Sequence, residues 1–303
     1  MRAEYNQKPQ AIVKGKNREI AVFGTDVNDK NLDEEVVKSF GEEWSKFHEF
    51  KKEEIDKIGD MYFDIVDEKI VNKGSYCIDI GCGTGRWSKY LAERAGFIEC
   101  VDPSDAIFVA DNLLSGLDNV RLSKASTDTI PFADQTFDFG MSIGVLHHIP
   151  DTQKALSDCV KKIKVGGHFY VYLYYALDNR GRLFRFVFGV SDLLRRFVSS
   201  LPAGIKRFFC DVLAIVAYMP FVLFGRFLRS IGLKGLAKKI PLSGYQDMSF
   251  FVIRNDALDR FGTKLEQRFT KEQVSAMMKN AGLEEVRVSP NFPYWHAIGK
   301  RKS

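Results

Sequence analysis

The stretch CIDIGCGTGRWSKY, residues 77–90, decides the fold of this 303-residue chain. It begins as a short apolar strand that contains one acid, Asp79, and it continues into a turn in which Gly81, Gly83 and Gly85 alternate with other residues. A helical pattern follows at once. A strand that ends in a glycine-rich turn and passes directly into a helix is typical of the ligand-binding edge of a parallel α/β sheet.

The spacing of these glycines indicates which ligand the turn suits. A dinucleotide fingerprint needs a glycine at position 86, where this chain has Arg86, and the Gly-Lys-Ser or Gly-Lys-Thr ending of a phosphate-binding loop is absent. Asp102 ends the next predicted strand. An acid at that place can accept hydrogen bonds from both hydroxyls of a ribose, although it could instead cap the following helix. The pattern therefore predicts a site for a nucleoside without a pyrophosphate.

Apolar segments alternate with helical patterns along the rest of the chain, which predicts right-handed crossovers and a parallel sheet. Near the C-terminus, Thr270 and Gln273 predict a capping box and Gly282 the end of that helix. The predicted class is α/β, a Rossmann-like doubly wound, mostly parallel seven-stranded sheet with a C-terminal antiparallel hairpin and a helical insertion. The expected strands span residues 75–80, 97–102, 119–125, 137–145, 166–176, 283–289 and 294–301, and the expected helices include 34–58, one that Ser104 caps and one that Asp151 caps.

Four motifs in this order resemble those of class I S-adenosylmethionine-dependent methyltransferases. They are D-x-G-x-G-x-G at 79–85, the acid Asp102, IPFADQTFDF at 130–139 and GVLHHI at 144–149. The resemblance covers roughly residues 70–176 together with the C-terminal helix and hairpin. It implies S-adenosyl-L-methionine as the cofactor, and the chain shows no metal-ligand pattern that would predict a metal site.

The resemblance also implies roles for single residues. Asp79 and the glycine turn would hold the methionine part of the cofactor, Asp102 the ribose and Pro103 the adenine side. Ser126 stands where such enzymes commonly have an acid, so a backbone amide, Thr127 or Asp128 is left to contact the adenine. The full set of implied cofactor-binding residues is Asp79, Gly81, Cys82, Gly83, Gly85, Asp102, Pro103, Ser126, Thr127, Val145 and His148.

Methyl transfer to a hydroxyl or an ammonium needs a base, whereas a neutral amine, an acidic phenol or an activated carbon needs little more than alignment. His147 and His148 follow the fourth strand, so one of them is a candidate base, and the alternative is that both line the cofactor pocket. Candidate substrate-binding residues are aromatic: Phe40 and Trp44 in a predicted lid helix, Tyr174 and Tyr175 in the predicted fifth strand, and Tyr294 and Trp295 in the hairpin. Ordinary core packing is the alternative for all of them.

A long insertion separates the fifth strand from the C-terminal helix. Residues 179–240 contain twelve Lys or Arg against Asp192 and Asp211, a net charge of +10, while the whole chain is +5. Within it, residues 208–225 are apolar apart from Asp211. We predict four segments: an N-terminal helical segment or lid at 1–70, a methyltransferase core at 71–177 and 250–303, and a helical cap at 178–249.

Three structures would explain this basic and apolar insertion. The first is a helical cap or dimer contact, the second an amphipathic element on an anionic membrane, and the third a membrane span, which Asp211 and Pro220 disfavour. We expect the cap. It should bury the apolar side chains of Phe208, Leu213, Val216, Phe221 and Leu223 against the core of the protein.

These observations predict a cytoplasmic methyltransferase that acts on a small or medium-sized metabolite, acidic or phosphorylated, through an O, N or C acceptor. Five unpaired cysteines and a polar N-terminal stretch favour the cytoplasm. The alternatives are a tRNA or RNA methyltransferase, a membrane-surface enzyme with a lipid-like substrate, and a non-catalytic partner protein. Nucleic acid is not the expected partner because the basic residues are interleaved with apolar runs. Peripheral membrane contact and a homodimer are left open.

Overall fold

The computed structural model describes residues 2–24, 31, 33–44, 52–179 and 181–302, without the side chains of residues 39, 40, 42–44, 182–187, 203, 255 and 259. The chain divides into two compact units. The core unit comprises Met1–Asp178 and Leu265–Ser303, and the helical unit comprises Asn179–Lys264. We had placed the return to the core at residue 250. The difference arises because the helix that follows this point packs with the helices of the insertion.

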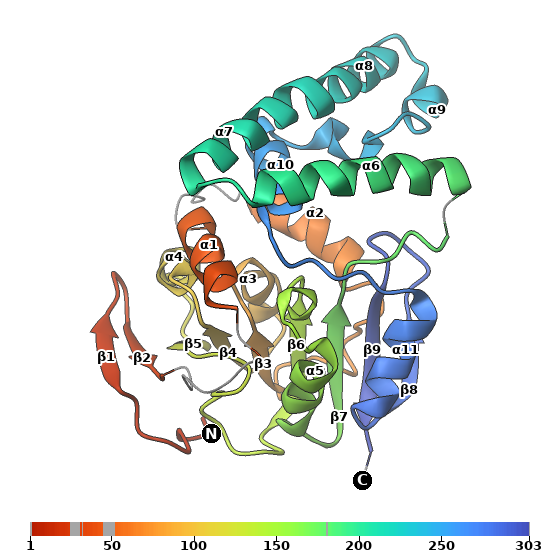
Figure 1. Ribbon diagram of the computed structural model, residues 1–303. Helices are drawn as coiled ribbons and strands as arrows, with labels where there is room; N and C mark the ends of the chain where they lie inside the picture. The colour runs from red at the N-terminus through yellow and green to blue at the C-terminus, as the bar shows by residue number, and fades with distance from the viewer. Residues whose placement is uncertain (1, 25–30, 32, 45–51, 180, 303) are drawn as a thin grey trace. The chain divides into compact units, whose positions relative to one another are not determined.

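The core unit is built on one sheet, which has nine strands within the described residues, in the order β1-β2-β5-β4-β3-β6-β7-β9-β8 (Figure 1). The neighbouring strands from β2 to β7 run parallel, and β9 and β8 continue the sheet antiparallel. The strands are β1 Ala11–Lys14, β2 Glu19–Val22, β3 Tyr76–Ile80, β4 Phe97–Asp102, β5 Val120–Lys124, β6 Phe137–Ile143, β7 Ile163–Tyr172, β8 Leu283–Val288 and β9 His296–Arg301.

Seven of these strands are the ones that the sequence predicts, and they form the expected mostly parallel sheet. The hairpin of β1 and β2 was not expected, since we had assigned residues 1–70 to a helical segment. Its strands are only four residues long, and β1 is exposed along its whole length, so it has no alternating apolar face that a sequence pattern could reveal. The hairpin extends the sheet beyond β5.

Helices cover both faces of the sheet. One buried cluster joins β3, β4 and β6 to the α2, α3 and α4 side, and the other joins the opposite face to α5 and α11. Both layers are visible in the lower part of Figure 1. The helices of this unit are α1 Glu34–Trp44, α2 Lys52–Tyr62, α3 Arg86–Ala92, α4 Ala106–Leu113, α5 Thr152–Lys161 and α11 Lys271–Asn280.

The helix ends follow local chemistry. The Asp151 side chain accepts a hydrogen bond from the Lys154 amide (2.8 Å), and Thr270 and Gln273 form the predicted capping box. At α4 the expectation was wrong by one residue, because Asp105 rather than Ser104 is the N-cap, without a side-chain hydrogen bond. Ser104 Oγ still accepts a hydrogen bond from the Ala106 amide (3.2 Å). The expected helix 34–58 is described as α1 and α2, and residues 45–51 lie outside the described part.

The helical unit has a small core of its own. Its elements are α6 Arg182–Ser199, α7 Ala203–Leu213, the π-turn Ala214–Tyr218, α8 Met219–Ser230, α9 Lys234–Ala237, the 3₁₀ turn Ser243–Asp247 and α10 Phe250–Gly262. The core side chains come from α6, from the α7–α8 helix and from α10, and they are Val198, Cys210, Ala214, Tyr218, Val222, Ile253, Ala257, Leu258 and Phe261.

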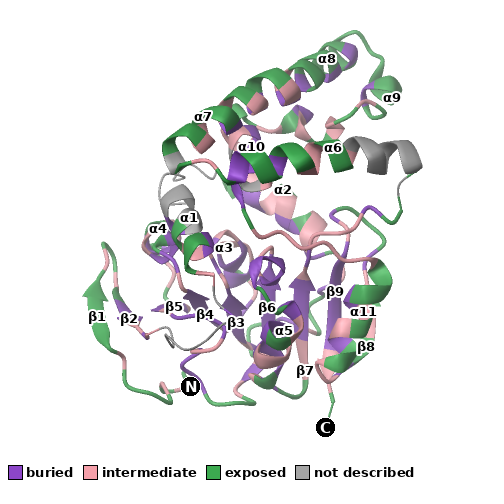
Figure 2. Ribbon diagram, in the orientation of Figure 1, coloured by how far each residue is buried: buried purple, intermediate pink, exposed green. Residues whose placement is uncertain are grey.

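The expected burial of the apolar insertion is wrong for most of the residues that we named. Phe208 is 64% exposed, Val216 67%, Phe221 43% and Leu223 53%, while Leu213 is half-buried. Figure 2 shows exposed residues along much of α7 and α8. The helix has apolar side chains all round, and this small core can cover only one side of it. Within the described residues, Gly204–Ser230 is long and apolar enough to cross a membrane by length and composition alone, and 28% of its most apolar window is buried inside the structure.

Candidate active site

The glycine turn joins β3 to α3 at the carboxyl edge of the parallel strands. Gly83 has φ +54°, and a Cβ added there would meet no atom within 4 Å, so this part of the turn is open. Gly85 has φ +82°, and an added Cβ would lie 2.9 Å from Leu114 Cδ1 of the α4 segment. The two glycines therefore serve different purposes, because one leaves backbone accessible to a ligand and the other permits close packing of helices.

Asp79 lies on β3 just before this turn and is fully buried. Ser88 Oγ of α3 donates a hydrogen bond to its Oδ2 (2.7 Å), while Oδ1 has no hydrogen-bond partner among the described residues. Burial, opposed by the Ser88 hydrogen bond and assisted by the nearby charge of Asp102, raises the pKa of Asp79 to about 7. A buried carboxylate oxygen without a partner is costly, which makes Asp79 a candidate ligand for a cationic or hydrogen-bond-donating group.

Asp102 ends β4 and faces the glycine turn. The Gly83 amide donates to its Oδ2 (2.8 Å), and the Ser104 amide and hydroxyl donate to its Oδ1 (2.8 and 2.6 Å). Burial is the main cause that raises the pKa of this carboxyl, and these hydrogen bonds oppose the rise. Asp102 is not the N-cap of α4. Its contacts fix the turn and the carboxylate against each other, which is the arrangement that a ribose-binding acid requires.

The segment after β5 contains Ser126 and Thr127, both buried. Ser126 Oγ lies 3.1 Å from Thr129 Oγ1 and its amide donates to the same hydroxyl (3.0 Å), so its side chain is engaged locally. Thr127 Oγ1, by contrast, has no hydrogen-bond partner in the described part of the chain. Asp128 forms an ion pair with Lys154 (2.7 Å). Of the side chains left open for the adenine, Thr127 offers a buried hydroxyl without a hydrogen-bond partner among the described residues.

A cavity of about 560 Å³ adjoins the strand ends of β4 and β5. Pro103 and Lys124 line it from the sheet, and Val37 and Gly41 line it from α1. An added Cβ at Gly41 would lie 3.1 Å from the Asp105 amide nitrogen, so α1 approaches the start of α4 closely. The predicted lid helix thus borders the same hollow as Pro103. The side chains of Phe40 and Trp44 lie outside the described residues, and their role stays a prediction.

A 3₁₀ turn, Leu146–His148, follows β6 and places both histidines in the interior. Val145 reaches the glycine turn, since a Cβ added at Gly81 would lie 2.5 Å from Val145 Cγ2. Neither ring nitrogen of His147 has a hydrogen-bond partner among the described residues. Burial, with the nearby positive charges of His148 and Arg268, lowers the pKa of His147 well below its ordinary value, so its ring is neutral at physiological pH.

The chain that re-enters the core unit, residues 265–269, runs across this turn and is called the strap below. Leu265 O lies 2.7 Å from His148 Nδ1, and the Gln267 amide donates to His147 O (3.0 Å). Gln267 Nε2 also donates to Ile149 O (2.7 Å). The strap could not be predicted from the sequence, because irregular backbone that binds other backbone leaves no pattern of side chains.

Arg268 of the strap faces the aromatic end of β7. Its guanidinium carbon lies 5.2 Å from the centre of the Tyr174 ring, and it forms an ion pair with Glu266 (2.6 Å). Tyr174 itself stacks on His147, with ring centres 3.9 Å apart and planes at 29°. Among the predicted substrate residues, Tyr174 is therefore the one that the structure brings to the histidines.

The other predicted aromatic residues form a separate group. Tyr175 contacts Tyr294 and Trp295, with ring centres 5.3 and 6.2 Å apart, and all three belong to or border the buried cluster on the α5–α11 face. Trp295 Nε1 donates to Asp178 Oδ1 (2.9 Å). Packing accounts for their positions, and a contact with substrate stays a prediction for them.

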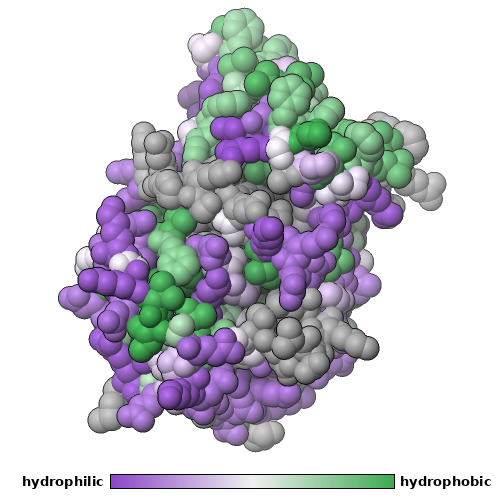
Figure 3. Space-filling view, turned by 60° about the vertical axis from the view of Figure 1, so that its left-hand side comes forward, coloured by the Kyte–Doolittle hydropathy of each residue, from purple (hydrophilic) through white to green (hydrophobic). Residues whose placement is uncertain are grey.

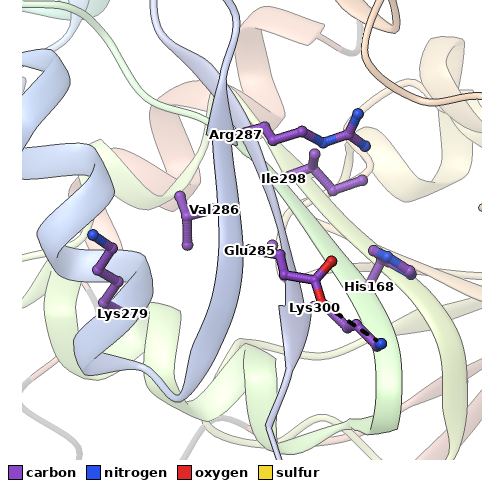
Figure 4. Close-up of a pocket in the computed structure, with 8 residues that line it drawn as sticks. His168, Lys279, Glu285, Val286, Arg287, Ile298 and Lys300 are labelled. Atoms are coloured by element: carbon purple, nitrogen blue, oxygen red, sulfur yellow. Dashed lines mark ion pairs between the residues drawn. The ribbon is translucent and has the colours of Figure 1, made fainter.

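A second cavity, of about 520 Å³, lies along β7, β9 and β8. Figure 4 shows Lys279 and Val286 on the α11 side of the hairpin and Arg287 and His168 on its other side, with the Glu285–Lys300 pair (3.8 Å) between the hairpin strands. Its polar groups do not converge on one point, and no residue of the glycine turn lines it. It is not a candidate active site.

Comparison with known proteins identifies the sheet segment. Residues 78–171 match the family model described as a methyltransferase domain. This segment is a methyltransferase domain. The match supports the methyltransferase core that the motifs predict, and it covers about a third of the chain.

The similar curated proteins are also methyltransferases. Ubiquinone biosynthesis O-methyltransferase of Coxiella burnetii is 26% identical over 160 residues, which span 51% of this chain and 66% of that protein. Demethylmenaquinone methyltransferase of Bacillus licheniformis is 32% identical over 102 residues, 32% of this chain and 44% of that protein. The chain thus spans slightly less than two thirds of the first relative. Human N-acetylserotonin methyltransferase in complex with S-adenosylmethionine is 12% identical, with a TM-score of 0.49 over 83% of this chain and 55% of that one.

The residues of the methyltransferase domain fit S-adenosylmethionine. Asp79 Oδ1 offers an unpartnered acceptor to the methionine ammonium, Gly83 leaves the turn open, and Thr127 Oγ1 offers an unpartnered hydroxyl. Asp102 presents its carboxylate beside the turn. Within the described residues no group of His, Cys, Asp or Glu side chains could hold a metal ion, and Cys82 is one of five free, buried cysteines.

Proposed function

We propose that this chain is an S-adenosylmethionine-dependent methyltransferase that transfers a methyl group to a hydroxyl of a small aromatic acceptor such as a quinol. When bound, the cofactor supplies the methyl group on a sulfonium. The acceptor hydroxyl must lose a proton during the transfer, and a neutral imidazole next to the site can take it. His147 is the observation that carries the proposal, because it is buried, neutral and without a hydrogen-bond partner among the described residues.

A phenolic hydroxyl is the acceptor that suits this base best. The lowered pKa makes His147 a weak base, so an alkyl alcohol would hold its proton too firmly, whereas a phenol or quinol is far more acidic. Tyr174, stacked on His147, offers an aromatic face close to the base. The names of the similar curated proteins, which include a ubiquinone biosynthesis O-methyltransferase, support the same class of acceptor.

His148 has a different task in this proposal. Its Nδ1 lies 2.7 Å from Leu265 O, so it ties the histidine turn to the strap and positions His147. RNA is not the proposed partner of the helical unit, because the basic residues of this unit alternate with exposed apolar side chains. A cytoplasmic location and a homodimer stay predictions from the sequence.

The variant His147→Phe tests the proposal, because phenylalanine keeps the stacking on Tyr174 and removes both ring nitrogens. We expect turnover of catechol or a dihydroxynaphthalene to fall by roughly a hundredfold or more, while calorimetric affinity for S-adenosylhomocysteine stays near the wild-type value. The urea midpoint should not fall, since two buried polar atoms without partners are removed. His148→Phe is the control, and it should lower both turnover and thermal stability.

Unchanged turnover in His147→Phe would remove the base from the proposal. Methylation of amines but of no phenol in the same assay would show that the acceptor class is wrong. Equal losses of turnover and cofactor affinity would assign His147 to the cofactor pocket instead.

A further inference from the structure

The helical unit exposes an unusual amount of apolar surface. Of the large hydrophobic side chains that are exposed among the described residues, all but Ile12, Val13, Val165 and Phe292 belong to Asn179–Lys264. Figure 3 shows apolar surface gathered over this part of the chain. Isolated exposed hydrophobic residues are normal on a protein surface, but a continuous apolar patch usually marks a binding surface.

The patch follows one face of the long helix. Along α7 and α8 the side chains that join the small core are Cys210, Ala214, Tyr218 and Val222, which recur every four residues. The opposite face, which we call the outer stripe, contains Ile205, Phe208, Phe209, Val212, Ile215, Val216, Leu223, Phe224 and Phe227, and each of them is at least 36% exposed. Spacings of three and four residues keep these side chains on one side of a helix.

The neighbouring elements extend the outer stripe. On α6, Val190, Leu193 and Phe197 are 55–68% exposed and repeat at helical spacing. Beyond α8, Leu233 and Leu236 are about half exposed on a segment that also contains lysines. The apolar surface is therefore shared by three helices, and the unit has no described side chains of its own that cover it.

The helical unit also carries an excess of positive charge that its own acids do not neutralise. Asp192 pairs with Arg195 and Arg196, Asp211 with Arg254, and Asp247 with Arg229 (2.5 Å). The Asp256 carboxylate accepts a hydrogen bond from the Tyr245 hydroxyl (2.6 Å). Each acid with a described side chain is thus engaged inside the unit. The described side chains of Lys206, Arg207, Lys234, Lys238 and Lys239 belong to none of these ion pairs, and Arg226 donates to the carbonyl oxygens of Gln246 and Met248.

We propose that the outer stripe docks on the surface of an anionic lipid bilayer and lies in its interfacial plane. Phenylalanine, leucine and valine side chains on one side of a helix, with lysines and arginines beside them, have the composition of interfacial helices. Apolar burial provides adhesion, and the cations outside these ion pairs provide attraction to anionic headgroups. A protein partner would explain the apolar stripe, but the excess of positive charge favours a negatively charged surface.

The inner face of the long helix argues against a membrane span. Asp211 lies on this helix and is bound to Arg254 of α10, and Tyr218 contacts Asp256. A spanning α7–α8 helix would either lose these partners or draw the charged α10 into hydrocarbon, and both are costly. A helix that lies in the interface keeps its inner face on the small core and inserts only the outer stripe.

Given the proposed function, docking on a bilayer would bring the enzyme to its substrate, because an apolar quinol-type acceptor dissolves in the bilayer. The docking itself can be tested without any acceptor. The full chain is mixed with vesicles of phosphatidylcholine alone or with roughly a third phosphatidylglycerol, and bound protein is measured by sedimentation. We expect binding to the anionic vesicles, weaker binding to the neutral ones, and partial release when the salt concentration is raised.

The variant Phe224→Ser/Phe227→Ser removes two side chains of the outer stripe that are 51% and 57% exposed. Partitioning onto anionic vesicles should fall by roughly tenfold or more, while the thermal midpoint and S-adenosylhomocysteine affinity stay unchanged. Ile12→Ser/Val165→Ser, at sites 62% and 50% exposed in the core unit, is the matched control and should bind vesicles as the wild type does. Lys238→Glu/Lys239→Glu should abolish the preference for anionic lipid.

Three results would overturn the docking. They are failure of the wild type to bind either vesicle, equal binding by the stripe variant, and a stripe variant that loses only self-association in sedimentation velocity. The last result would assign the stripe to contact between two copies of this chain. Vesicle binding without turnover of any phenol would leave the docking standing and refute the proposed function alone.

Discussion

Replacing Asp79 by Asn should make the protein more stable at neutral pH while it weakens cofactor binding. Asp79 is fully buried on β3, and its one hydrogen bond in the described structure comes from Ser88 Oγ. Asparagine has nearly the same shape, and its amide can still bond the Ser88 hydroxyl. The substitution removes a titration and leaves the packing in place, so the change in stability can be calculated from the pKa of the group.

The magnitude follows from linkage between protonation and folding. The pKa of Asp79 is about 7 in the folded protein, against 3.8 for an ordinary aspartate, chiefly because of burial. A raised folded pKa means that the folded state holds the proton more tightly than the unfolded one. The contribution of Asp79 to stability is therefore full below pH 4 and is lost as the pH rises to 7. At about 1.4 kcal/mol per pH unit, the loss approaches roughly 4 kcal/mol.

Urea unfolding of the wild type and of Asp79→Asn between pH 5 and 8.5 measures this effect. The difference in unfolding free energy should grow in favour of the variant by about 1.4 kcal/mol per unit up to roughly pH 7 and then stay constant. Asp134→Asn, at an exposed side chain that pairs with Lys162, is the control and should show no such slope. A flat difference curve for Asp79→Asn would refute the argument, because it would mean that Asp79 is ionised in both states.

Protonation of Asp79 should also make cofactor binding depend on pH. A methionine ammonium binds the ionised carboxylate, so binding must release the proton that Asp79 holds below pH 7. The affinity of wild-type protein for S-adenosylhomocysteine should therefore rise between pH 6 and about 7.5, and Asp79→Asn should show weaker binding without this rise. Calorimetry in two buffers of different ionisation enthalpy counts the released proton. Proton uptake instead of release would contradict the assignment of Asp79 to the ammonium.

Two further predictions concern the glycine turn. Asp102→Asn should weaken S-adenosylhomocysteine binding by about ten- to a hundredfold, the cost of hydrogen bonds to a charged group, and calorimetry that finds equal affinity would limit Asp102 to holding Gly83 and Ser104. Gly83→Ala should cost only about 1–2 kcal/mol of stability for its positive φ yet abolish most binding, because its Cβ enters the open turn. Gly85→Ala should be the less stable of the two in urea, since its Cβ also meets Leu114 at 2.9 Å, and the reverse order would contradict the division of roles.

Much of the sheet could be predicted because its information is local. The strand that contains Asp79 is an apolar run interrupted by that one acid and lies between Gly74 and Gly81. Thr270 and Gln273 together predict a helix start from two residues. The β1–β2 hairpin escaped prediction because its strands are short and one of them is exposed throughout. Strand pairing at such an edge depends on backbone hydrogen bonds, which any sequence can make.

In the candidate site, too, some residues could be predicted from the sequence and others could not. Asp102 and the glycines could be predicted, because each lies at or just after the end of a predicted strand and their spacing along the chain indicates a ligand-binding turn. The strap was invisible, since Leu265 and Gln267 contact the histidine turn from more than a hundred residues away. The apolar insertion misled us for another reason. A hydrophobic pattern predicts that a residue leaves water, but it does not say whether protein or lipid replaces the water.

The two chain connections between the helical unit and the core unit lie close to His147, the proposed base. The chain leaves the core unit just after Tyr174, which stacks on His147, and it returns through the strap, whose Gln267 amide holds the carbonyl of that same histidine. A residue near each connection therefore contacts His147. The Tyr174 ring and the Gln267 amide restrain His147 from two sides within the core unit. A site with one unpartnered base depends on such restraint, because a small displacement of the base from the acceptor hydroxyl costs a large part of the rate.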